Sequence, residues 1–229
     1  MITKVYEKMK NFIKENKFFL FTIFFIITIS YIPLPYYIYA PGGVVDVEKR
    51  FDIENAYPSK GSFNMAYVSE YRATVPTYLL ALLKKDWDIV SKEEVVAPQE
   101  TEEENLIRNK YLLEEANQDA VINAFSYANK KCEITKEELY ITYVDEIADT
   151  DLKIGDQILS LDNKKVRSKE ELQSYLQEKE IGAVVIFEVL RDNKVKTVTG
   201  KVQSVDGEGK IGIVITSNRT LKTVPQISF

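Results

Sequence analysis

The residues of this chain that could perform acid–base chemistry are aspartates standing two positions apart. The pairs are Asp86 with Asp88 and Asp149 with Asp151. Paired carboxylates act as general acid and base when their surroundings separate their pKa values. The sequence around both pairs gives no sign of such buried surroundings, and turn-forming acids in loops are the simpler interpretation.

Two absences restrict the chemistry further. The chain has no His, so a Ser-His-Asp triad, a Cys-His pair and a His-ligated zinc site are excluded within it. It has one Cys, Cys132, which excludes an internal disulfide and a Cys-x-x-Cys site. We interpret Cys132 as a partly buried small residue rather than a reactive thiol. We therefore assign no catalytic residue, no metal ligand and no cofactor.

Charge is distributed unevenly along the 229 residues. The formal net charge is −5, yet residues 1–17 carry five lysines and residues 18–32 carry no charge. The rest of the chain is acidic and has no strongly basic stripe, which argues against a nucleic-acid partner.

The uncharged segment predicts a helical transmembrane anchor over residues 18–40. It is rich in Phe and Ile, continues into a Tyr-rich stretch suited to a membrane interface, and reaches the length that a bilayer core requires. Pro33 and Pro35 are expected to end the helix near the outer interface. The preceding lysines place residues 1–17 in the cytoplasm and the bulk of the chain outside the cell membrane, as a single-pass protein.

Two other interpretations of this segment fit it less well. A cleaved signal peptide would place Ile38 at the −3 position, where a small residue is favoured, after a long basic region. A buried core helix would show a polar face, which this segment lacks. The retained anchor is the preferred interpretation.

Residues 41–130 predict a mixed α/β region that follows a turn at Pro41-Gly42-Gly43. Strands are expected from Val44 and over 62–68. A short helix is expected over 74–85, with Pro76 in its first turn. The acidic run 99–105 is a solvated loop or helix start, and apolar residues at helical spacing predict a long amphipathic helix over 106–128.

Beyond this region the pattern becomes mostly β. Strands are expected over 139–144, 184–190, 195–202 and 211–216, and residues 152–161 are expected to form a turn that leads into a further strand. Tight turns are expected at 162–163 and 191–194. Ser168 with Glu171 three positions later predicts the capped start of a helix that carries Leu172 and Leu176 on one face.

One stretch within this region resembles the core signature of bacterial PDZ domains. The stretch is Leu152-Lys153-Ile154-Gly155-Asp156-Gln157-Ile158, in which Gly155 permits a sharp turn and Asp156 can accept bonds from its amides. The resemblance implies a circularly permuted PDZ domain over 131–218, a small β-barrel or sandwich with a groove helix.

The same resemblance implies a peptide-binding groove. Lys210-Ile211-Gly212-Ile213 is similar to the loop whose amides receive a peptide's C-terminal carboxylate. The peptide would add as a strand beside Ile213, Val214 and Ile215, with Leu172 and Leu176 lining the pocket for its last side chain. Plain core packing remains the alternative for these two leucines.

The order of segments along the whole chain resembles the membrane-anchored, Lon-like PDZ proteases of Gram-positive bacteria. The segments are a Lys-rich start, an apolar span, Pro33-Leu34-Pro35-Tyr36-Tyr37, an acidic stretch, a long helix and the PDZ-like region. In that family a proteolytic domain with a Ser/Lys dyad follows the PDZ domain, and no ATPase module is present. Its Gly-Pro-Ser-Ala-Gly nucleophile segment has no counterpart here, so no catalytic residue is carried over.

These observations predict an α+β chain in five parts. They are a cytoplasmic tail (1–17), an anchor (18–40), an extracytoplasmic α/β region (41–130), a PDZ domain (131–218) and a linker (219–229) to an absent Lon-type protease domain. The expected function is recognition of peptides or unfolded protein C-termini for such a protease, acting in cis or in trans, in processing or quality control. The alternative is a stand-alone membrane PDZ adaptor.

Overall fold

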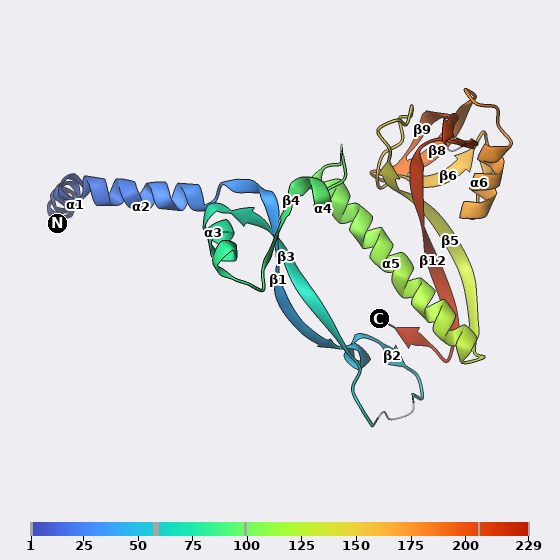
Figure 1. The fold of residues 1–229 in the computed structure, drawn as a ribbon, viewed down its shortest axis with the longest axis horizontal. Coiled ribbons are helices and arrows are strands. Elements are labelled where there is room, and N and C mark those ends of the chain that lie inside the picture. Colours follow the sequence, from blue (N-terminus) through green and yellow to red (C-terminus); the bar gives the residue numbers. More distant parts are fainter. Residues whose placement is uncertain (1, 57–59, 99, 206, 229) are drawn as a thin grey trace. The chain divides into compact units, whose positions relative to one another are not determined.

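The computed structural model describes residues 2–56, 60–98, 100–205 and 207–228, which form two compact units (Figure 1). The N-terminal unit comprises Met1–Val47 and Ser62–Val95, and the C-terminal unit comprises Glu48–Gly61 and Val96–Phe229. The stretch 41–130, expected to be one region, is therefore divided between the two units.

Two helices, α1 (Ile2–Glu15) and α2 (Lys17–Ser30), begin the N-terminal unit. The helix ends before Pro33 and Pro35, as expected, but the assignment of 33–40 to the anchor is wrong, because these residues lie in the strand β1 (Pro33–Asp46). Two prolines at the start of that stretch cannot continue a helix. Tyr37, Ile38 and Ala40 of β1 are buried against protein.

Among the described residues, no helix combines the length and the apolar character that crossing a membrane requires.

The sheet of the N-terminal unit is antiparallel, with β1 between β3 (Asn64–Thr74) and β4 (Asp88–Ser91). The predicted helix after β3 is confirmed as α3 (Val75–Leu83), with Pro in its first turn. Ile38, Ala73 and Ala81 form a small core, beside which the Tyr71 and Trp87 rings meet edge to face at 6.0 Å. Two short elements complete this part of the chain: η1 (Val47–Arg50) after β1, and α4 (Lys92–Val95) after β4.

The C-terminal unit contains the predicted long helix, α5 (Glu102–Tyr127). Thr101 caps it by accepting a bond from the backbone amide of Glu104 at 3.2 Å, while the Glu104 carboxylate accepts from the Thr101 amide at 2.8 Å. The helix packs on two strands, β5 (Lys131–Val144) and β12 (Ile213–Val224). Tyr111 of α5 stacks on Tyr140 of β5 with ring centroids 4.2 Å apart, and burial raises the pKa of Tyr140 to about 12.

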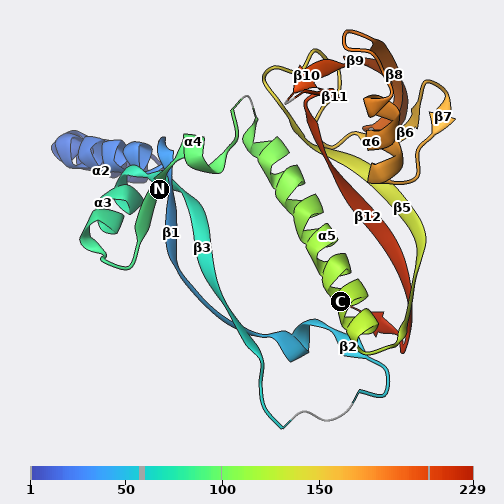
Figure 2. The ribbon, with the colours of Figure 1, turned by 45° about the vertical axis from the view of Figure 1, so that its right-hand side comes forward.

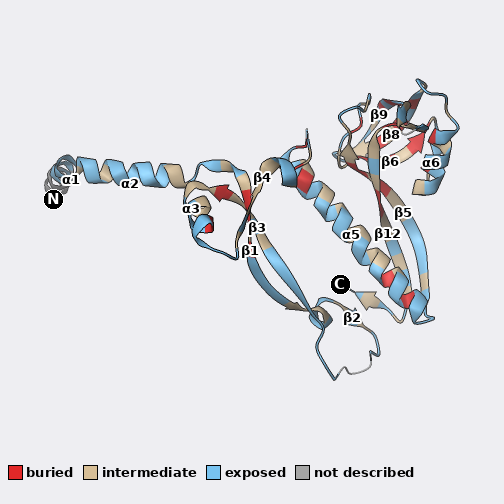
Figure 3. Ribbon diagram, viewed as in Figure 1, coloured by how far each residue is buried: buried red, intermediate tan, exposed pale blue. Residues whose placement is uncertain are grey.

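The main sheet runs in the order β12-β5-β6-β8-β9, and all its pairings are antiparallel. Its remaining strands are β6 (Gln157–Leu161), with β7 (Lys164–Lys165) beside it, β8 (Val184–Arg191) and β9 (Lys194–Lys201). Along the chain, the helix α6 (Lys169–Gln177) lies between β7 and β8, and the short pair β10 (Gln203–Val205) and β11 (Glu208–Lys210) lies between β9 and β12 (Figure 2). The larger buried core of the chain lies in these elements and includes Leu161, Val185 and Phe187. Figure 3 shows buried residues in β6, β8 and α6, and others in the N-terminal unit and on α5.

The tight turns are those that the sequence predicts. Asp162 and Asn163 have φ of 44° and 64°, and Asp192 and Asn193 have φ of 52° and 58°. Asn and Asp tolerate this left-handed region better than most residues, which explains their place between paired strands.

The end of the chain differs from expectation. Residues 219–224, expected to belong to a linker, continue β12 and pair with 131–137 of β5. The last strand, β13 (Ile227–Ser228), pairs with β2 (Asp52–Ile53). The Thr- and Val-containing sequence of 219–224 suits a strand once a partner lies beside it, and the sequence pattern alone did not identify that partner.

Candidate binding groove

A groove of ≈ 410 Å³ lies between α6 on one side and the start of β12 on the other. The structure brings all eight residues predicted to bind a peptide together around it: Leu172, Leu176, Lys210, Ile211, Gly212, Ile213, Val214 and Ile215. Sequence analysis did not single out several further lining residues, among them Tyr143, Asp145, Lys169 and Gln173.

The helix wall of the groove is fixed at its first turn. The hydroxyl of Ser168 accepts a bond from the Glu171 amide at 3.2 Å, as predicted. The Glu171 carboxylate accepts from the backbone amide of Arg167 at 2.8 Å, so it holds the residue before the cap. Leu172 and Leu176, one turn apart, therefore face the same way.

These two leucines serve both of the roles that the sequence left open. They belong to the buried core around Phe187, and they also line the groove. The groove is consequently lined by the margin of the hydrophobic core, an apolar surface suited to an apolar side chain.

The loop before β12 depends on a glycine. Gly212 has φ of +80°, a conformation that L-residues rarely adopt, and a Cβ there would lie 3.1 Å from the Cβ of Ala148. Its carbonyl accepts a bond from the Asp145 amide at 2.8 Å. The side chain of Ile211 is buried at 1% exposure, so this residue anchors the loop to the core.

The strand wall of the groove is the edge of the sheet. β12 is the first strand in the sheet order and pairs with β5 on its inner side. Ile213, Val214 and Ile215 form the groove-lining part of β12. An edge strand offers unpaired backbone amides and carbonyls to another chain.

The mouth of the groove carries charges of both signs. Lys169, Lys210 and Asp145 are among the lining residues. The ammonium of Lys210 lies 3.0 Å from the Glu208 carboxylate, with about half of each side chain exposed, a pair that contributes little to stability. Lys169 contacts Glu115 of α5 at 2.5 Å.

The turn that carries the PDZ-like signature supports the sheet behind the groove. Gly155 has φ of +89°, and Asp156 accepts a bond from the Lys153 amide at 2.9 Å, as predicted. The partner that sequence analysis missed is Arg191, which lies 35 residues later and pairs with Asp156 at 2.5 Å. Its hydrogen bonds to Asp156 raise the pKa of Arg191.

A second polar cluster holds the turn after β6 against α6. Burial raises the pKa of Asp162, but bonds from the Ile186 amide, Tyr175 and Lys179 outweigh it, and the resulting pKa is lowered. The three distances are 2.9, 2.7 and 2.9 Å. This cluster fixes the base of the helix wall.

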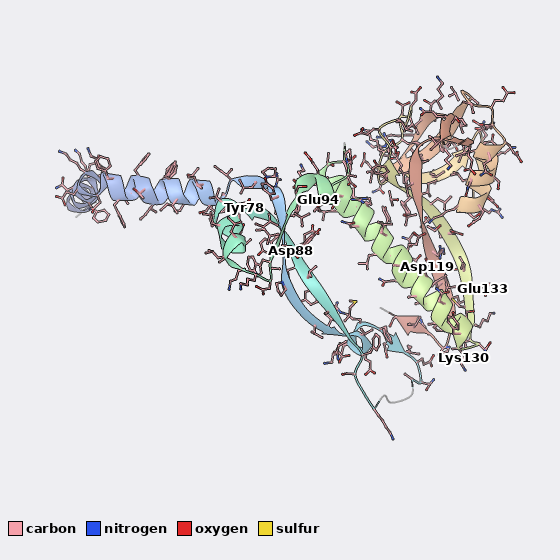
Figure 4. The ribbon with its side chains drawn as sticks, in the orientation of Figure 1. Tyr78, Asp88, Glu94, Asp119, Lys130 and Glu133 are labelled. Atoms are coloured by element: carbon pink, nitrogen blue, oxygen red, sulfur yellow. The ribbon has the colours of Figure 1, made fainter. Side chains whose placement is uncertain are left out.

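The four aspartates considered for acid–base chemistry either contact nearby side chains or are exposed. Asp149 lies 3.8 Å from Lys201, and Asp151 accepts a bond from the Thr199 hydroxyl at 3.0 Å. Asp86 and Asp88 are exposed; Figure 4 labels Asp88 at the start of β4. In the described parts of the chain, no three His, Cys, Asp or Glu side chains gather as a metal site would require.

A comparison with known protein families gives a match within the C-terminal unit. The PDZ domain family matches residues 116–202. This range shares 131–202 with the expected domain, and the loop and strand at 210–215 lie beyond it. No curated protein matches the chain.

Two solved structures are similar to part of the chain. One is the PDZ domain of an SdrC-like protein from Listeria monocytogenes, with 24% identity, 36% of this chain and 92% of that chain covered, and a TM-score of 0.34. The other is the corresponding domain from Listeria innocua, with 26% identity, 34% and 92% coverage, and a TM-score of 0.31. On the family match, the chain contains a PDZ domain.

Proposed function

We propose that the groove binds the C-terminal segments of peptides or unfolded proteins by strand addition. The observation that carries the proposal is the coincidence of three features in one groove: an open strand edge, a glycine loop at its end and an apolar floor. Backbone bonds to the edge would supply affinity, and the loop amides would receive the carboxylate.

The experiment compares two acetylated Thr-Val-Thr-Val peptides, one with a free carboxylate and one amidated. Isothermal titration calorimetry with the purified full chain measures both dissociation constants. We expect the free acid to bind at least tenfold more tightly, about 1.4 kcal/mol. Equal affinities would show that no carboxylate loop operates here.

We further propose that the bound termini are delivered to a Lon-like serine peptidase, in cis or in trans. The order of segments along the chain supports this role, and the stand-alone adaptor is the alternative. The test purifies the protein from its own cells by an N-terminal tag and assays an unfolded substrate. Peptidase activity that falls when Gly212→Val is introduced supports delivery, whereas a preparation without peptidase supports the adaptor.

We also propose that the N-terminal unit attaches the chain to a membrane. The support is α2, whose large apolar side chains are exposed, including Phe18, Phe21 and Phe24 at 78%, 66% and 67%. Flotation of the full chain with phospholipid vesicles measures attachment. We expect the triple change of Phe18, Phe21 and Phe24 to Ser to abolish flotation; flotation unchanged by it would exclude α2 as the contact.

A further inference from the structure

Helix α5 directs charged side chains toward the strands beside it and leaves a row of apolar side chains exposed. The helix lies along β5 and β12 (Figure 2). Glu115 accepts a bond from the Ser217 amide of β12 at 3.1 Å, and Asp119 forms an ion pair with an arginine of the same strand. Among the apolar residues of α5, which the structure describes along its whole length, only Val121 and Phe125 are buried. A surface helix ordinarily buries its apolar side, so the exposed row points to a partner outside this unit.

The exposed row follows one side of the helix. Leu106, Leu113 and Tyr127 are 70%, 62% and 90% exposed and stand at multiples of seven residues. Positions seven apart nearly coincide around a helix, so the row extends for about 30 Å along it. Figure 3 shows exposed residues over much of α5. We call this surface the outer face of α5, and it consists of exposed residues without charge: Leu106, Leu113, Ala116, Ala120, Ala124 and Tyr127.

The two halves of the outer face differ in bulk. Leu106 and Leu113 project from the first half, whereas Ala116, Ala120 and Ala124 make the second half shallow. Two such helices pack most closely when they run antiparallel, because the leucines of each helix then lie against the alanines of the other. A parallel pair would set leucine against leucine and leave a gap between the alanines.

The charges at the two ends of α5 favour the same arrangement. Its first turn holds Glu102 and Glu103, whereas Lys130 and Lys131 follow its last turn, where Figure 4 labels Lys130. In an antiparallel pair, the acidic start of each helix lies beside the basic end of the other, and the opposed helix dipoles attract. A parallel pair would bring like charges together. The outer face is therefore complementary to a reversed copy of itself in both bulk and charge.

We propose that the outer face of α5 binds a second copy of this chain, in an antiparallel helix pair whose two-fold axis passes near Ala116. The proposal is independent of peptide binding, because the groove lies between α6 and β12 and α5 does not line it. Each C-terminal unit carries one groove, so the pair presents two.

Disulfide trapping in the full chain, purified in a non-ionic detergent, tests both the partner and its direction. Cys132 is first replaced by Ser, so that each variant carries a single Cys. Ala116→Cys should form a disulfide-linked dimer, because the axis brings the two Cα atoms within the roughly 7 Å that a disulfide spans. Leu106→Cys should stay unlinked, because an antiparallel pair separates its two copies by about 25–30 Å. Ile181→Cys, at a position 63% exposed in the same unit, controls for random collision.

Two outcomes of the trapping experiment would overturn the proposal. One is an Ala116→Cys variant that links no faster than Ile181→Cys. The other is a Leu106→Cys variant that links as readily as Ala116→Cys, which would indicate a parallel or disordered contact.

Sedimentation equilibrium in the same detergent provides a second readout. The wild type should sediment with about twice the chain mass of 26.3 kDa. Leu113→Glu places a charge within the contact and should raise the dimer dissociation constant at least tenfold. The fold should be retained, because Leu113 is exposed in the single chain. The matched control is Ile181→Glu, which changes a residue of equal exposure away from α5 and should sediment as the wild type.

A wild type that sediments as a monomer would overturn the proposal, and is the result expected if the N-terminal unit of the same chain or another protein covers the outer face. A dimer that Leu113→Glu leaves intact would also overturn it, and would assign the association to another surface such as α2.

Discussion

The carboxylate of Asp156, the residue before β6, is fully buried and lies 2.5 Å from the guanidinium of Arg191. Arg191 is the last residue of β8, which pairs with β6. Two guanidinium nitrogens contact it, and the Lys153 amide donates to the same carboxylate. The turn before β6 and the end of β8 are therefore held by one charged, hydrogen-bonded group.

We expect Asp156→Ala to destabilise the PDZ domain by about 3–5 kcal/mol, because it leaves a largely buried guanidinium and a backbone amide without this partner. Amide exchange of β6 and β8 measures the effect. Trp fluorescence would not report the effect, because Trp87, the single Trp, lies in the N-terminal unit. In a double variant with Arg191→Ala the two losses should not add; additive losses would show that the pair is not coupled.

Gly212→Val should lower the affinity for the free-acid Thr-Val-Thr-Val peptide at least tenfold, about 1.4 kcal/mol. The reason is that the side chain crowds Ala148 and displaces the loop amides. The matched control is Gly182→Val. Gly182 has φ of +92°, a similar backbone conformation, but a Cβ there meets no atom within 4 Å. Equal loss of affinity in both variants would indicate general destabilisation rather than a groove effect.

Asp162 should make the PDZ domain sensitive to acid. Its pKa is lowered in the folded state from the ordinary value of 3.8, so its stabilising contribution is present above pH 3.8 and is lost as pH falls through the folded pKa. Asp162→Asn should cost about 1–2 kcal/mol at pH 7, and the difference from wild type should shrink below pH 4. Amide exchange of β8 across this pH range measures it. A difference that stays constant with pH would exclude this carboxylate as the cause.

The purified chain should hydrolyse no protein or peptide. It has no His and one Cys, and no recognisable Ser/Lys segment is present. Incubation of the purified full chain with unfolded casein for hours, followed by mass spectrometry, should show intact substrate. Cleavage that disappears when one Ser or Asp of this chain is replaced would contradict the expectation.

The sequence determined the local features of the groove. Helix α6 begins where Ser168 and Glu171 predict it, because capping involves neighbouring residues. The turns at Asp162-Asn163 and Gly155-Asp156 were predicted for the same reason, since residues that tolerate positive φ signal a turn without distant contacts. The eight residues expected to line the groove were identified because short motifs of this sequence resemble those of PDZ domains, and all eight line it.

Tertiary structure decided the features that depend on distant pairs. The tyrosine-rich stretch after Pro33 suits a membrane interface or a strand equally well, and pairing of β1 with β3 and β4 made it a strand. Residues 219–224 became part of β12 because β5 lies alongside. The bond from the Ser217 amide to the Glu115 carboxylate joins residues 102 positions apart. No local periodicity encodes such a contact, because it exists only once α5 has packed against the sheet.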